Sequence, residues 1–127
     1  MSLAANAVIA LIGLLHVYIL VLEMFLWDKP AGRRAFGMTQ EMATATKTLA
    51  ANQGLYNGFL AAGLFWGLWL GDAGPSVKVF FLLCVLAAGL YGAATASRKI
   101  LFIQAVPAAI GLALLALVIW VLWSTIK

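Results

Sequence analysis

Apolar residues fill four long stretches of the chain, and most of the charged residues fall between these stretches. A helix that rises about 1.5 Å per residue needs about 20 residues to cross a hydrocarbon core of about 30 Å, and each stretch reaches that length. In such a core a helix satisfies every backbone group within one segment. The pattern therefore predicts membrane-spanning helices at residues 3–27, 48–70, 77–97 and 100–123.

The segments between these helices predict how the helices are connected. Residues 71–76 are a short Gly/Asp/Pro turn, which indicates that the second and third helices are antiparallel neighbours. In the longest connection, residues 28–32 predict a turn, and Thr39 could cap a helix that leads into the second span. The first span has no basic start and no clear cleavage site, so we expect it to be retained rather than removed as a signal peptide.

The composition is that of an integral membrane protein. Of the 127 residues, 65% are hydrophobic and 9% are charged, and the mean hydropathy is +1.07, which lies outside the range of soluble domains. No linker, repeat or low-complexity tract divides the chain, so we expect a single domain over residues 1–127. The predicted fold class is all-α, an antiparallel bundle of four transmembrane helices in a lipid bilayer.

Basic residues predict the orientation of this bundle. The net charge of +4 comes from Lys and Arg between the apolar stretches, which fits anionic lipid headgroups better than nucleic acid, and we expect no nucleic-acid partner. Lys78 and Lys127 lie on the other side of the bundle. The other six basic residues lie in the first and third connections, namely Lys29, Arg33, Arg34, Lys47, Arg98 and Lys99. By the positive-inside rule these connections face the cytoplasm, and both termini lie on the same, non-cytoplasmic side.

Polar side chains inside the first two spans point to a site, because each is costly in hydrocarbon and tends to face a bundle interior. His16 and Glu23 are seven residues apart, which places them within about 20° of one face and about 10 Å apart along the helix axis. The second span carries four polar residues within a wedge of about 140°, namely Asn52, Gln53, Tyr56 and Asn57. We expect both polar faces to point into the bundle.

Small residues continue the wedge of the second span. They are Gly63, Gly67 and Gly71, and side chains this small let helices approach closely. The large aromatic residues on the other side are expected to meet lipid, and they are Phe65, Trp66 and Trp69. In the fourth span, Pro107 removes an amide that would have bonded the Ile103 carbonyl, so the helix should loosen there.

The polar residues of all four spans are predicted to converge. Tyr91 and Gln104 lie close to the third connection, and antiparallel helices alternate in direction, so these residues map to the same half of the membrane as those of the second span. The predicted ligand-binding residues are Glu23, His16, Asn52, Gln53, Tyr56, Asn57, Tyr91 and Gln104. Because desolvation disfavours a buried carboxylate, a proton-linked site is one interpretation of Glu23.

Simpler roles exist for the same residues. Amides and phenols often act as interhelical hydrogen-bonding groups, and a lone His16 is more often a buried neutral imidazole than a ligand. Glu23 could instead reach the interface or pair with a basic residue of the first connection. No metal or other cofactor is expected, because His16 and Glu23 are too far apart for one ion and the single Cys84 builds no Cys-based site.

Several runs of residues resemble a bacterial family of small membrane proteins known as domain of unknown function 1304. They are HVYILVLEMFLW at residues 16–27, Phe36 with Gly37, ANQGLYNGFLAAGL at 51–64, AGLYG at 88–92 and QAVP at 104–107. The resemblance implies a four-helix protein of the bacterial inner membrane whose recurring polar positions are the eight residues named above. It implies no activity.

Three classes of function stay open. The first is binding or transport of a small amphiphilic, lipid-like or cationic solute from the cytoplasmic side, with Glu23 as the charge partner, in a protein that forms a homodimer or homo-oligomer. The second is an intramembrane enzyme that acts on a lipophilic substrate with Glu23 or His16 as acid/base. The third is a structural or partner subunit, in which the glycine face of the second helix serves assembly.

Overall fold

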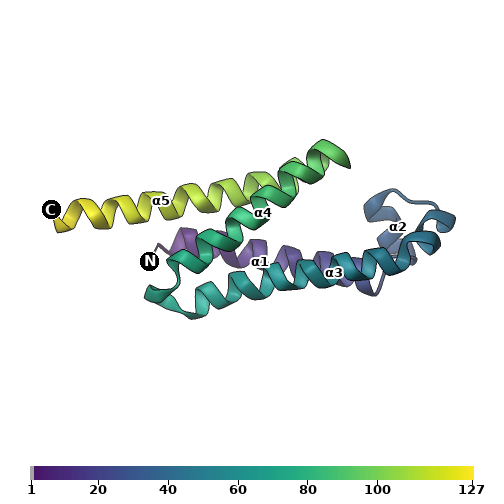
Figure 1. Ribbon diagram of the computed structural model, residues 1–127, viewed down its shortest axis with the longest axis horizontal. Coiled ribbons are helices and arrows are strands. Elements are labelled where there is room, and N and C mark those ends of the chain that lie inside the picture. Colours follow the sequence, from purple (N-terminus) through teal and green to yellow (C-terminus); the bar gives the residue numbers. More distant parts are fainter. Residues whose placement is uncertain (1) are drawn as a thin grey trace. The chain divides into compact units, whose positions relative to one another are not determined.

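A computed structural model describes residues 2–127 of the protein, and every regular element in that part of the chain is helical. The elements in chain order are α1 (Leu3–Met24), α2 (Pro30–Phe36), α3 (Gln40–Trp69), the 3₁₀ turn η1 (Gly71–Ala73), α4 (Pro75–Thr95), the π-helical segment η2 (Leu101–Ala105) and α5 (Val106–Ile126) (Figure 1). The all-α prediction is therefore confirmed.

Within residues 2–127, three helical segments are long and apolar enough to cross a membrane, namely Leu3–Met24, Pro75–Thr95 and Leu101–Ile126. They match the first, third and fourth predicted spans to within a few residues at each end. The remaining long helix, α3, has 30 residues and reaches about 45 Å, but the amides of Asn52, Gln53 and Asn57 lower its hydropathy. A fourth span through α3 stays a prediction.

The connection after α1 is more ordered than the sequence predicts. α1 ends at Met24 rather than at residue 27. The predicted turn at residues 28–32 is confirmed for Asp28 and Lys29 and is wrong for the rest, because α2 begins at Pro30. Proline suits the first position of a helix, since its φ is already helical and its missing N–H has no helical partner there. The predicted cap is confirmed, because α3 begins after Thr39 and Thr39 Oγ1 accepts a hydrogen bond from the Met42 backbone N at 3.2 Å.

The chain divides into two compact units. The first unit contains α1 through Gly13 together with Ala62–Lys127, and the second unit is Leu14–Ala61. The division falls within α1 and α3, so each unit contains part of both helices.

In the first unit, α3 and α4 pack against each other through glycines. The Phe81 ring covers Gly63, and the Lys78 stem covers Gly67. Contacts that move forward along one helix and backward along the other confirm that these helices are antiparallel neighbours. The Phe65 ring packs against Gly13 of α1, so the prediction that Phe65 faces lipid is wrong, because the space over a glycine lies on that side. Trp69 is 82% exposed.

The α4–α5 hairpin of the first unit contains the irregular segment η2, and Figure 1 shows α4 and α5 as neighbouring rods. A Cβ at Gly89 would lie 2.6 Å from the Ala105 backbone N, so the two backbones nearly touch there. The π-helical turn ends just before Pro107, in agreement with the predicted loosening. α5 also packs through Gly111 on Leu82.

Candidate functional site

A buried carboxyl group and a buried amide meet in the second unit. Glu23 lies in the last turn of α1 and is 1% exposed, and Asn57 lies in α3 and is 8% exposed. Asn57 Nδ2 donates a hydrogen bond to Glu23 Oε1 at 2.6 Å and a second one to the Gln53 backbone O at 3.2 Å. Two of the eight predicted residues are thus brought into direct contact.

Glycines of α3 allow this contact. A Cβ at Gly54 would lie 2.7 Å from Met24 Cγ and 3.0 Å from Glu23 Cβ, and a Cβ at Gly58 would lie 2.6 Å from Leu20 Cδ1. The last two turns of α1 therefore rest directly on the backbone of α3. Because Asn57 lies between these two glycines in sequence, its short side chain reaches the carboxyl group.

One oxygen of the carboxyl group has no partner. Glu23 Oε2 is buried and accepts no hydrogen bond within residues 2–127. Gln53 lies near the carboxyl group without reaching hydrogen-bond geometry with Oε2. A buried acceptor without a donor is destabilising by about 1–3 kcal/mol, and native proteins keep few of them.

No cation balances Glu23 within the described residues. Lys47, the basic residue of α3, instead pairs with Asp28 at 3.2 Å, and the hydrogen bond from Lys47 holds the pKa of Asp28 below its ordinary value. Glu23 neither reaches the surface nor forms an ion pair, so both simpler roles considered for it are absent from this structure.

His16 is also buried in the second unit. It is 0% exposed and lies on α1 seven residues before Glu23, which corresponds to about 10 Å along the helix. The two side chains share a stripe of α1, as predicted, but they are too far apart to act on one small ion.

The other predicted residues are more exposed. Asn52 turns back to its own helix, since its Nδ2 donates to the Thr48 backbone O at 2.9 Å, and Tyr56 is 58% exposed. Tyr91 is 74% exposed and Gln104 is half-buried in η2, and both belong to the first unit. The polar wedge of α3 therefore does not face inward as a whole, because the close contact with α1 is made by the small residues next to it.

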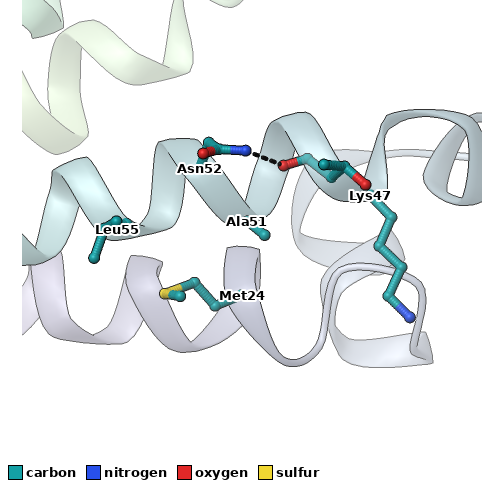
Figure 2. A pocket seen from close by; sticks show the side chains of 6 residues that line it. Met24, Lys47, Ala51, Asn52 and Leu55 are labelled. Atoms are coloured by element: carbon teal, nitrogen blue, oxygen red, sulfur yellow. Dashed lines mark hydrogen bonds between the residues drawn. The ribbon is translucent and has the colours of Figure 1, made fainter.

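A shallow depression of about 340 Å³ is formed by residues that are close in sequence to Glu23 and Asn57. It is lined by Met24, Lys47, Thr48, Ala51, Asn52 and Leu55. Figure 2 shows the Met24 side chain from α1 against α3, with Ala51 and Leu55 above it and the Lys47 ammonium directed away. Its walls are mainly apolar, and they carry one amide and the stem of one cation.

The sequence interpretation missed a second buried polar pair, which lies in the first unit. Lys78 of α4 is 1% exposed, and its Nζ donates to Asn6 Oδ1 at 3.0 Å. The sequence places Lys78 at the start of the predicted span 77–97, where it was considered only as a basic residue of the non-cytoplasmic side. The sequence does indicate that Lys78 is helical, because it follows Pro75 by less than one helical turn. Gly67 of the neighbouring helix α3 leaves room for the Lys78 stem.

Residues 2–127 contain no group of three His, Cys, Asp or Glu side chains able to hold a metal ion. What the second unit offers is a buried carboxyl group with one free acceptor, an apolar surround and a neutral amide partner.

Comparisons with known proteins cover most of the chain. A family model described as "Protein of unknown function (DUF1304)" matches residues 10–116, a range that contains all eight predicted site residues. The chain is also similar to "Uncharacterized protein YpaA" of Lactococcus lactis subsp. lactis, with 33% identity over 110 residues that cover 85% of this chain and 88% of that protein. No solved structure matches the chain at a significant level.

Proposed function

The chain belongs to the DUF1304 family, whose description assigns no activity, and we propose that it is an integral membrane protein that binds or translocates a small cationic or amphiphilic solute at Glu23. The observation that carries this proposal is the buried Oε2 atom of Glu23 without a hydrogen-bond donor. A cation or an N–H group of a ligand would satisfy that atom.

The surroundings of Glu23 favour a lipophilic cation over a small hydrated ion. Residues 2–127 offer no group of three His, Cys, Asp or Glu side chains that would hold a metal ion. The depression next to Met24 is lined mostly by carbon, which suits an apolar body attached to a charged head. We place the entry of the solute at this depression, where the flexible Met24 side chain can move aside.

The proposal includes a membrane arrangement. α3 crosses the bilayer as the fourth span, with Asn57 shielded against α1, and both termini lie on the non-cytoplasmic side of a bacterial inner membrane. Because the exposed Asn52, Tyr56 and Tyr91 would be costly against lipid, a homodimer or homo-oligomer would cover them.

Tetraphenylphosphonium, a lipophilic cation, is a suitable probe for the purified protein in detergent. Equilibrium dialysis should show saturable binding to the native protein and a loss of about tenfold or more in Glu23→Gln, because the amide carries no negative charge to attract the cation. Glu41→Gln is the matched control, since it removes the same charge from an exposed position in the first turn of α3.

The two variants separate the possible outcomes. Equal binding by Glu23→Gln and the native protein contradicts the proposal, provided that circular dichroism shows unchanged helix content. An equal loss in Glu41→Gln also contradicts it, because the effect would then come from the overall charge.

A further inference from the structure

A second candidate site lies on the connection between α1 and α3, outside the carboxyl–amide pair. A depression of about 330 Å³ is lined by Pro30, Arg33, Arg34, Gly37 and Met38. From these contacts we infer that this depression, the α2 basic site, binds the phosphate of an anionic phospholipid headgroup.

An unpartnered donor in the α2 basic site supports this inference. Arg33 Nε is buried and has no hydrogen-bond partner within residues 2–127. No carboxylate in that part of the chain lies within ion-pair distance of the Arg33 or Arg34 guanidinium. A phosphate group presents several acceptor oxygens, and it accepts paired hydrogen bonds from a guanidinium edge made of Nε and a terminal nitrogen.

Contacts of α2 hold the backbone of the two arginines in place. Gly32 packs so closely on the Leu26 carbonyl that a Cβ would collide with it. The end of α2 is closed by Gly37 in the left-handed region, at φ 63°, and by a hydrogen bond from the Met38 N to the Arg33 O at 2.9 Å. Two arginines on one fixed helical backbone lose less backbone conformational entropy on binding than two arginines in a mobile loop.

Aromatic contacts indicate a lipid as the source of the phosphate. The Trp27 and Phe36 rings lie 4.8 Å apart between centroids, and Trp27 Nε1 donates to Thr46 Oγ1 at 3.0 Å. Phe25 and Phe36 are 65% and 41% exposed. Basic side chains beside exposed aromatic rings, next to the end of a span, are typical of the headgroup level of a bilayer.

Native mass spectrometry of the purified protein tests the α2 basic site. The probes are phosphatidylglycerol and phosphatidylcholine with the same acyl chains. The native protein should retain phosphatidylglycerol in preference, and Arg33→Gln and Arg34→Gln should each lower that retention by about tenfold. Arg33→Lys should also lower it, because lysine keeps the charge but lacks the Nε donor. Arg98→Gln, which removes one charge from the third connection, should leave retention unchanged.

Any of the following results would overturn the inference. One is full retention in Arg33→Gln with unchanged helix content by circular dichroism. Another is full retention in Arg33→Lys or an equal loss in Arg98→Gln, since either shows that net charge alone attracts the lipid. The last is complete displacement of phosphatidylglycerol by excess inorganic phosphate, which would assign the site to free phosphate. Tetraphenylphosphonium binding is measured on the same variants and should be unchanged in all of them.

Discussion

Each unit of the molecule contains one buried charged side chain that meets an amide from another helix. In the second unit Glu23 accepts from Asn57 at 2.6 Å, and in the first unit Lys78 donates to Asn6 at 3.0 Å. Both charged residues are 1% exposed. The two pairs differ in how completely the charged side chain is accommodated. Glu23 has a buried oxygen without a hydrogen-bond donor, whereas the Lys78 stem packs against Gly67.

We propose that this difference separates a structural contact, at Lys78, from a binding site, at Glu23. A long side chain that fills the space over a glycine and ends on an amide stabilises the packing of three helices. A carboxyl group with an unused acceptor contributes less to stability than it could, and such unused capacity is common at functional sites. The following predictions test this contrast, from the largest expected effect to the smallest.

Shortening Lys78 should destabilise the first unit most. Lys78→Ala removes a buried stem and leaves Asn6 Oδ1 without its donor, so we expect a loss of about 2–3 kcal/mol in the free energy of unfolding. Lys78→Met keeps most of the side-chain volume and should lower the free energy of unfolding by about 1 kcal/mol or less. Unfolding in mixed detergent micelles measures both. Equal losses in the two variants would show that the charge, not the packed stem, is what matters.

Filling the contact between α1 and α3 should disturb the Glu23 pair. Gly54→Ala places a methyl group 2.7 Å from Met24 Cγ and 3.0 Å from Glu23 Cβ, and we expect a loss of about 1–2 kcal/mol together with weaker tetraphenylphosphonium binding. Gly58→Ala meets the mobile end of Leu20 and should have the smaller effect on both. The reverse order in the same unfolding and dialysis measurements would contradict the described packing.

The partly exposed ion pair of the second unit, Lys47 with Asp28, should give the smallest effect. Because Lys47 lowers the folded-state pKa of Asp28, the pair stabilises the protein above the unfolded pKa of about 3.9 and loses that contribution as the pH falls through the folded pKa. Between about pH 6 and pH 3 the Tm of the native protein should fall slightly more than that of Asp28→Asn. Parallel Tm curves for the two proteins would remove any stabilising role for this pair.

The sequence predicts where the helices lie along the chain better than it predicts which side of each helix turns inward. Long apolar runs locate α1, α4 and α5 because few other structures suit them, and Pro107 correctly predicts an irregular turn before α5. α2 was missed, since its short helix depends on the tertiary contact between Gly32 and Leu26.

Which side of a helix turns inward depends on packing contacts with other helices, and the periodicity of polar residues along one helix does not reveal these contacts. Asn52 can satisfy its amide on its own helix, so its polarity does not decide which side of α3 turns inward. Gly54 and Gly58 determine which side of α3 turns inward, because they permit the closest approach of α1. Glu23 and His16 were identified as buried from their depth in an apolar run, whereas Lys78, at the start of the predicted span 77–97, entered only the count of basic residues.

Infrared difference spectroscopy of the carboxyl region tests the central claim most directly, because it reports on the Glu23 side chain itself. Adding tetraphenylphosphonium to the native protein should change a carboxyl or carboxylate absorption, and the same change should appear in Glu41→Gln and be absent in Glu23→Gln. A spectrum that changes equally in Glu23→Gln, or stays unchanged in the native protein at saturating probe, would contradict the assignment of Glu23 as the group that receives the solute.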